Sequence, residues 1–314
     1  MEVVLSQPAD LPAMIDLLKL SLGETLMPKS EAFFTWKHFE NPFGASKVLL
    51  AKEGDEIIGL RAFMHWEWAK DNQRRRAVRA VDTATNPTHQ GKGIFKKLTM
   101  QAVEECKAEG VHFVFNSPNV ASRQGYLKMG WIDAGKMPIF FKPGVLFPKS
   151  YNKNLGEDIA NAFPLEKACE IWANKNLPVT FDAWSTPLSV EFLKWRYNDC
   201  PLIKYGAFAG DGDLGIVFRI KQIKSFRELR ICEIWANNPM ARKSLKQELK
   251  NIVHYTRPAV VSCAPNALIK EGFGFFGPFK KGPLTTVREL TLTDLSDYIQ
   301  FNDWQPSIGA MEVF

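Results

Sequence analysis

The hydrophobic pattern of the first 145 residues alternates between period two, typical of strands, and period 3.6, typical of helices. Apolar residues recur at helical spacing after Asp10, which is expected to cap a helix ending near Gly23. A second helical pattern begins at Ile94 and ends at Gly110. The remaining patterns predict a short helix over 119–128 and strands over Val3–Leu5, Val48–Lys52, Ile57–Trp68, Arg76–Thr85, Val111–Phe115 and Ile139–Lys142.

Four sequence features recur in the same order later in the chain, which indicates an internal repeat. The heptapeptide WKHFENP at residues 36–42 returns as WRYNDCP at residues 195–201. Stretch 117–135 matches stretch 264–282, including three glycines at identical spacing. The other matched positions are Gly59 with Gly215 and Pro87 with Pro239, and the repeated glycines are Gly125, Gly130 and Gly135 against Gly272, Gly277 and Gly282.

The repeat predicts two tandem copies of one α/β domain built on a mixed sheet. The first copy is expected over residues 1–145 and the second over 165–314, where it includes a C-terminal extension. The segment 146–164 is the predicted linker, because proline, glycine and lysine are frequent there.

One loop of the first copy has the composition of an anion site. The stretch NPTHQGKGIFKKL, residues 86–98, places Gly91 and Gly93 between a predicted strand and a predicted helix. Backbone N–H groups at such a helix start bind phosphate. The loop matches neither a P-loop, which ends in Gly-Lys-Ser/Thr, nor a dinucleotide fingerprint, which would need a glycine at Lys96.

Here the sequence resembles the GNAT superfamily of N-acetyltransferases, whose loop is Gln/Arg-x-x-Gly-x-Gly/Ala. Residues 90–95 read QGKGIF and depart from that pattern only at Phe95, where a small residue is usual. A later family pattern of Asn, small, Tyr, Gly and aromatic residues is also present, at Asn119, Ser122, Tyr126, Gly130 and Trp131. The resemblance covers residues 1–142; beyond them it depends on the internal repeat.

The resemblance implies that acetyl-CoA is the co-substrate and that the loop binds its pyrophosphate. Strand 76–85 would contact the pantetheine and the thioester, and Asn119 would contact the pantetheine arm. The helical spacing puts the side chain of Phe95 on the buried face. The cofactor-binding residues expected on this basis are Thr83, Ala84, Thr85, Gln90, Gly91, Lys92, Gly93, Ile94, Phe95, Lys96, Asn119 and Ser122.

Two residues are candidates for the proton transfers of acyl transfer. The resemblance implies that Tyr126 is the general acid toward the departing thiolate; the alternative is a packed aromatic side chain. Asp82 is the candidate base, because it is a carboxylate in an apolar strand and burial would raise its pKa. An ion pair with Arg61 or Arg79 is an equally good interpretation, and Glu67 is the next candidate base.

The second copy lacks these features. Its counterpart of the loop is NPMARKSLKQEL, which has no glycine, and Phe273 stands opposite Tyr126. Ile234 stands opposite Asp82, next to Glu233. A single acetyl-CoA site in the first copy is therefore expected, with the second copy shaping the acceptor cleft or an interface.

Composition sets limits on the class of protein. The net charge of +6 is too small to indicate nucleic-acid binding. The five cysteines and five histidines are scattered without metal-ligand spacing, so neither a metal site nor a disulfide framework is expected. No signal peptide or membrane span is predicted, and a reducing cytoplasm fits the cysteine usage. A homodimer is left open.

The sequence thus predicts an N-acetyltransferase that transfers the acetyl group of acetyl-CoA to the primary amine of a small molecule or amino sugar, by direct attack in a ternary complex. Residues 24–47 and the second copy are expected on the acceptor side; the tryptophans at Trp66 and Trp68 line either an acceptor pocket or the core. Two alternatives stay open: a non-catalytic acyl-CoA sensor and a Fem-type aminoacyl transferase. Donors with a longer acyl chain are also left open.

Overall fold

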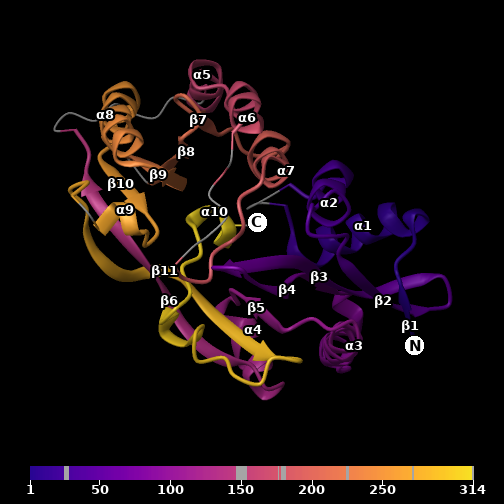
Figure 1. Cartoon of the computed structure of the whole chain (residues 1–314). Helices are drawn as coiled ribbons and strands as arrows, with labels where there is room; N and C mark the ends of the chain where they lie inside the picture. Colours follow the sequence, from indigo (N-terminus) through magenta and orange to yellow (C-terminus); the bar gives the residue numbers. More distant parts are fainter. Residues whose placement is uncertain are drawn as a thin grey trace.

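The computed structural model describes residues 1–24, 28–145, 154–175, 177, 182–223, 226–270 and 272–312. Within these ranges the chain forms one eleven-stranded mixed sheet flanked by helices (Figure 1). The strands are β1 (Glu2–Leu5), β2 (Lys47–Glu53), β3 (Glu56–Lys70), β4 (Gln73–Thr85), β5 (Phe113–Asn116), β6 (Ile132–Pro143), β7 (Gly206–Phe208), β8 (Leu214–Ile223), β9 (Phe226–Ala236), β10 (Val260–Cys263) and β11 (Phe276–Glu289).

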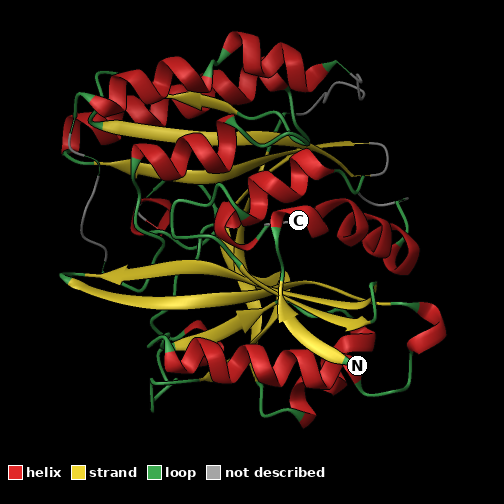
Figure 2. Ribbon diagram, turned by 90° about the vertical axis from the view of Figure 1, so that its right-hand side faces the viewer, coloured by secondary structure: helices red, strands yellow, loops and turns green. Residues whose placement is uncertain are grey.

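Helices lie on both sides of the strands, as Figure 2 shows. Three short 3-10 turns and a π turn over Lys194–Asn198 complete the described elements. The helices are α1 (Leu11–Leu22), α2 (Glu31–His38), α3 (Ile94–Ala108), α4 (Val120–Lys128), α5 (Leu155–Ala162), α6 (Leu165–Ala173), α7 (Val190–Leu193), α8 (Pro239–Thr256), α9 (Ala267–Lys270) and α10 (Ile308–Met311).

Most elements predicted for the first 145 residues are present, with two corrections. The strand expected at Ile139–Lys142 is the end of the longer β6, which begins at Ile132. Asp10 does stand before α1, but its side chain makes no capping bond to that helix. Its two carboxylate oxygens are bound elsewhere, since Oδ2 accepts from the Gln7 backbone N–H and Oδ1 pairs with Lys52.

The two halves repeat one order of elements. In the first half β3 and β4 form an antiparallel hairpin, α3 follows, and β5 lies parallel to β4. In the second half β8, β9, α8 and β10 have the same relation. Part of the predicted linker belongs to this second half, since Leu155 and Ile159 of α5 pack in its core. Residues 146–153 of the predicted linker lie outside the described residues.

The final strands of the two halves are exchanged. β6 leaves the first half and pairs through residues 140–143 with β10. β11 returns from the second half and pairs through Thr286–Glu289 with β5. The resulting order is β5-β11-β6-β10, so each half supplies a strand that the sheet of the other half requires. The sequence gives no sign of this exchange, because both strands have ordinary strand patterns.

A reciprocal contact joins the two copies of the repeated heptapeptide. Trp36 Nε1 donates to the backbone oxygen of Trp195 at 2.6 Å, and Trp195 Nε1 donates to that of Trp36 at 2.7 Å. The rings stack with centroids 5.3 Å apart. Because equivalent residues touch each other only on a twofold axis, this pair marks a local axis between the halves.

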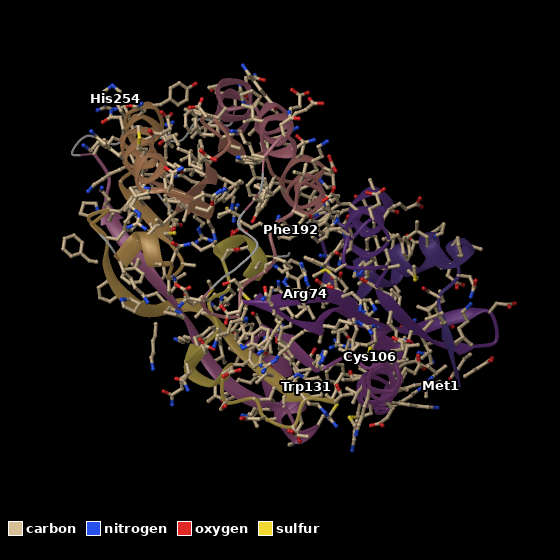
Figure 3. All side chains as sticks on the ribbon, viewed as in Figure 1. Met1, Arg74, Cys106, Trp131, Phe192 and His254 are labelled. Atoms are coloured by element: carbon tan, nitrogen blue, oxygen red, sulfur yellow. The ribbon has the colours of Figure 1, made fainter. Side chains whose placement is uncertain are left out.

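The largest hydrophobic cluster fills the space between the halves. Trp66 and Trp68 of β3 belong to it and are almost fully buried, so they are core residues and do not line an acceptor pocket. Phe192 of α7 packs on Trp66 from the second half, and it lies between the two halves in Figure 3. Separate clusters lie under α1 and α2, under α3 and under α8.

The reciprocal tryptophan pair predicts two matching losses of stability. Trp36→Phe and Trp195→Phe each keep an aromatic ring but leave a buried carbonyl without its donor, so each should lower the free energy of unfolding by about 1–3 kcal/mol in urea titrations. Trp304→Phe is the control, because the Trp304 Nε1 atom is buried without a partner among the described residues. Losses that differ clearly between Trp36→Phe and Trp195→Phe would contradict the symmetric contact.

Candidate functional site

The glycine loop forms the start of α3. Gly91 and Gly93 have φ angles of 78° and 79°, in the left-handed region that favours glycine. Gly93 is the N-cap residue, so no side chain caps the first N–H groups of α3. A Cβ added at either glycine would meet no atom within 4 Å, so the space beside the loop is open.

The side chains around the loop divide into exposed and buried ones. Lys92, Lys96 and Lys97 are exposed beside the helix start and add positive charge to the helix dipole. Ile94 is buried under β3, where its Cγ2 would lie 2.5 Å from a Cβ at Gly59. Of the predicted cofactor residues in the loop, Ile94 can therefore offer only its backbone, and its packing explains the glycine at position 59.

The parallel pair β4 and β5 separates beside this loop. Their pairing ends at Arg79 and Phe115, so Thr83, Ala84 and Thr85 pair only with β3 on the other side. A bulge between β3 and β4 falls at the same place, where residues 81–82 are unpaired. The Thr85 N–H at this edge donates to Ser21 Oγ at 3.4 Å, and the other backbone groups of the edge could bind an extended polar chain such as pantetheine.

Asn119 and Ser122 lie at the start of α4. The Asn119 side chain accepts a hydrogen bond from the Ser122 backbone N–H at 2.8 Å, so the asparagine caps this helix. Its carboxamide oxygen is therefore already bound, and only the amide NH₂ remains for a ligand. Asn119 is exposed and Ser122 is half-buried.

Tyr126 is buried beneath the loop. Its ring packs edge-on against Phe95, with centroids 5.5 Å apart, and against Trp131. Its hydroxyl accepts a hydrogen bond from Arg61 Nη2 at 2.7 Å. Arg61 is fully buried and lies over the rings of Phe63, Phe95 and Tyr126. Tyr126 is thus a packed aromatic residue whose hydroxyl is oriented by a cation. Phe95 is half-buried, close to the buried position expected for it.

Asp82 lies at the bulge of β4, in an ion pair with α2. Its Oδ2 atom is 2.8 Å from Lys37 Nζ and 2.8 Å from His38 Nε2. Burial by itself raises the pKa of Asp82, but the Lys37 charge and the His38 hydrogen bond outweigh burial and hold the pKa well below its usual range. The prediction of a raised pKa for Asp82 is therefore wrong, and its ion-pair partners are Lys37 and His38, not Arg61 or Arg79.

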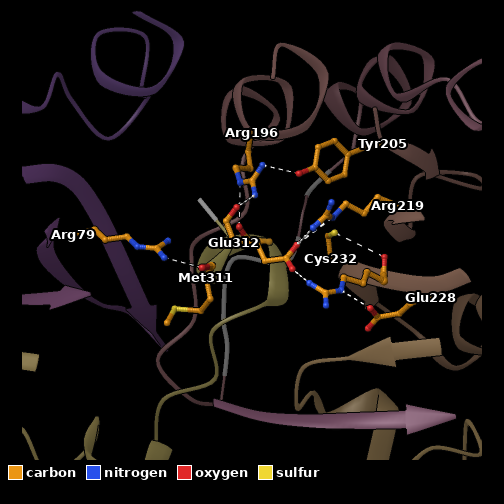
Figure 4. Close-up of polar contacts among 10 residues, drawn as sticks. Arg79, Arg196, Tyr205, Arg219, Glu228, Cys232, Met311 and Glu312 are labelled. Atoms are coloured by element: carbon orange, nitrogen blue, oxygen red, sulfur yellow. Dashed lines mark hydrogen bonds and ion pairs between the residues drawn. The ribbon is translucent and has the colours of Figure 1, made fainter. Parts of the chain in front are cut away.

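Glu67 does not join the site. It pairs with Arg74 near the turn of the β3–β4 hairpin, opposite Arg76 in the register, whereas Asp82 lies toward the other end of β4. Arg79 also has another role, since it donates to the backbone oxygens of Ala310 and Met311 (Figure 4).

Several solved structures resemble almost the whole chain. Each of three covers 92% of it: GCN5-related N-acetyltransferases from Anabaena variabilis (13% identity, 72% of that chain, TM-score 0.62) and Kribbella flavida (12%, 71%, 0.60), and Eis1 from Mycobacterium abscessus (12%, 74%, 0.57). At such identities the similarity shows the fold, and it includes both halves. No curated protein sequence matches the chain.

The sequence of the first half supplies the deciding match. Residues 2–133 match the family model of an acetyltransferase (GNAT) domain. This segment of the chain is a GNAT-superfamily domain. The matched segment contains the glycine loop, the bulge at Asp82 and Tyr126.

Lys37 and His38 of this site were not predicted, and Arg61 was named only as a possible ion-pair partner of Asp82. Lys37 and His38 belong to the repeated heptapeptide WKHFENP, so the repeat drew attention to the segment but not to its contact with Asp82. Arg61 gave no signal beyond being a charged residue inside an apolar strand. Its contact with Tyr126 joins residues 65 positions apart.

The register also corrects the comparison of the two halves. Gly59 pairs with Thr85 in the first half, and Gly215 pairs with Trp235 in the second. When the two halves are aligned on these pairs, Glu233 is the equivalent of Thr83. The equivalent of Asp82 is then Cys232, not Ile234. Glu233 therefore adjoins the second bulge, where Cys232 is unpaired.

The structure also bears on metal ligands, thiols and membrane-spanning helices. Across the described ranges, no group of three or more histidine, cysteine, aspartate or glutamate residues could hold a metal ion. All five cysteines are free and buried. In the same part of the chain, no helix has the length and apolar character needed to cross a bilayer.

The Asp82 cluster predicts a large, pH-dependent stabilisation. Asp82→Asn leaves Lys37 buried without its counter-ion and should cost roughly 3 kcal/mol at pH 7. Because the folded-state pKa is lowered, this contribution is complete above the unfolded value of 3.8 and should decline only as the pH falls below it. Urea unfolding at several pH values measures the difference.

Asp303→Asn is the matched control, because its pair with Lys70 is about one-third exposed on both sides. It should cost less than about 1 kcal/mol. Equal losses in the two variants would show that the Asp82 cluster is not a buried ion pair in solution.

Proposed function

We propose that the first half of the chain is an N-acetyltransferase that uses acetyl-CoA and acts on the primary amine of a small molecule or amino sugar. The observation that carries the proposal is the start of α3: two left-handed glycines, an N-cap without a side chain and open space beside it. Uncapped N–H groups and the helix dipole fit a pyrophosphate. The free cysteines are consistent with a cytoplasmic enzyme.

The residues present fit acetyl-CoA along one path. The backbone of residues 91–95, with Lys92 and Lys96 beside it, would bind the phosphates, and the free edge of β4 at Thr83–Thr85 would hold the pantetheine arm. Acetyl-CoA supplies a thioester there. The chain's contribution is to align that thioester with the amine, since orientation lowers the barrier by up to about 7–11 kcal/mol.

Tyr126 is the proposed acid for the leaving thiolate. Because the Tyr126 hydroxyl oxygen accepts from Arg61, its own proton points away from the guanidinium and is available to a ligand. The Arg61 guanidinium would also stabilise the negative charge left on the Tyr126 oxygen after proton transfer. Arg61 thereby acts as a positioning residue. We assign Asp82 a positioning role as well, because a carboxylate held ionised by Lys37 has little affinity for a proton. The amine would then lose its proton to water.

A substitution in the loop tests cofactor binding. Gly93→Ala forces a non-glycine residue into the left-handed region and disturbs the N–H groups, so acetyl-CoA affinity measured by calorimetry should fall about tenfold or more. Gly110→Ala is the control, because Gly110 has a φ of 75°, lies at the other end of α3 and meets no atom within 4 Å. It should lose similar stability but keep its affinity.

The wild-type protein should bind one acetyl-CoA per chain, because α8 has no glycine loop. Two sites per chain, or unchanged affinity in Gly93→Ala, would contradict the proposed site.

Tyr126→Phe tests catalysis separately from binding. The turnover number in thiol-release assays with a panel of amines should fall about 100-fold, with little change in KM for acetyl-CoA. Tyr298→Phe is the matched control, because it removes another buried hydroxyl that accepts from an arginine, Arg75. Unchanged turnover in Tyr126→Phe would remove the acid role; binding without thiol release for any amine would favour the acyl-CoA sensor.

A further inference from the structure

A cavity of about 240 Å³ lies where β9 and β10 separate in the second half. The pairing of these parallel strands ends at Ile231 and Cys263, and the cavity is lined by residues 232–237 and 263–268, which follow directly. It occupies the place that the β4–β5 opening occupies in the first half. The second half has therefore kept this opening although it has lost the glycine loop.

A carboxyl group with an aromatic partner has also been kept there. Tyr197 Oη donates to Glu233 Oε1 at 2.5 Å, as His38 Nε2 meets Asp82 at 2.8 Å in the first half. His38 and Tyr197 occupy the same position of the repeated heptapeptide. Each half thus holds a carboxyl group at the bulge of its central hairpin through the same element.

The two carboxyl groups differ in the position of the neighbouring cation. In the first half Lys37 touches Asp82. Its counterpart Arg196 turns away and donates to the backbone oxygens of Gly309 and Glu312 and to Tyr205 (Figure 4). Burial raises the pKa of Glu233 to about 7, although hydrogen bonds from Ser307 and Tyr197 and the more distant Arg196 charge oppose the shift.

One oxygen of Glu233 has no hydrogen-bond partner among the described residues. Both hydrogen bonds to Glu233 end on Oε1, and within the described residues Oε2 receives none. Ser185, Thr186 and Gln305 also line the cavity; the Thr186 hydroxyl accepts from Trp66 Nε1, and the Ser185 hydroxyl donates to the backbone oxygens of Ala183 and Gln305. A donor-rich group with positive charge matches this wall.

We propose that this cavity binds a small primary amine, whose ammonium group pairs with Glu233 Oε2. An ammonium has three donors, so it can bond to this oxygen and to other oxygens of the wall. The proposal is independent of acetyl transfer in the first half.

An anionic or phosphorylated ligand does not fit this site. Asn238 caps α8 by accepting from the Ala241 backbone N–H, and Pro239 follows it, so the helix start has fewer free donors than that of α3. Asp182 and Glu233 in the wall would repel an anion, and among the described residues that line the cavity only Arg242 is basic.

The pH dependence of amine binding follows from the groups around Glu233. An ammonium pairs with the ionised carboxylate, so affinity should rise as Glu233 loses its proton near pH 7. Burial raises the pKa of both Cys232 and Tyr197, so neither titrates in this range. The titratable and charged groups that face Glu233 from the packed elements and the cavity wall are Tyr197, Arg196, Cys232, Cys263, Asp182 and Arg242.

Calorimetry without acetyl-CoA tests the proposal, with n-butylamine as the probe and butyramide as a neutral analogue of similar shape. The wild-type protein should bind n-butylamine about tenfold more tightly at pH 8 than at pH 6 and bind butyramide weakly at both. These measurements need no variant. Absence of n-butylamine binding, equal affinity for butyramide, or tighter binding at pH 6 would overturn the proposal.

Two variants then assign the site. Glu233→Gln should weaken n-butylamine binding at least tenfold and abolish its pH dependence, while unchanged binding would place the amine elsewhere. Glu228→Gln makes the same change to another buried glutamate of β9, which pairs with Arg230 and does not line this cavity. It should bind the amine like the wild type. Failure of acetyl-CoA binding in the first half would leave these results unaffected.

Discussion

The exchange of β6 and β11 is the constraint on which the rest of the structure depends. Because β11 lies between β5 and β6, the first half has no complete sheet without a strand from the second. One side of the β4–β5 opening beside the glycine loop is formed by β5, and β5 is paired on its other edge with β11 of the second half. The Trp36–Trp195 contact lies where the two heptapeptides meet, so the exchange and the aromatic pair hold the halves in one relative orientation.

This arrangement gives two similar sites different chemistry. Each half places a carboxyl group at the bulge of its central hairpin and bonds it to a side chain of the heptapeptide. Where Lys37 lies against Asp82, the carboxylate stays ionised and serves as a fixed counter-ion. Arg196 instead donates to backbone oxygens of Gly309 and Glu312, in and just after α10. Burial then raises the pKa of Glu233 to about 7. The direction of one basic side chain decides between these outcomes.

Local pattern was enough to predict most strands and helices of the first half, because period and end signals lie within a few residues of each element. The glycine loop was predicted for the same reason: Gly91 and Gly93 occur within one short motif. Contacts between distant segments were not predictable. The pKa of Asp82 depends on Lys37, 45 positions earlier, and the sequence placed Asp82 only in an apolar strand. The strand exchange was missed because pairing partners are not encoded in the alternation of a single strand.

The exchanged strands also determine which residues of the second half can change. Gly282 of β11 lies so close to Met137 of β6 that an added Cβ would meet the backbone oxygen of Met137 at 2.7 Å. Gly215 of β8 leaves room for the Trp235 ring in the same way. The second half has no glycine loop, but substitutions at these glycines would still deform the sheet of the half that has one. The fold of the second half is therefore constrained by the first half, whose sheet includes β11.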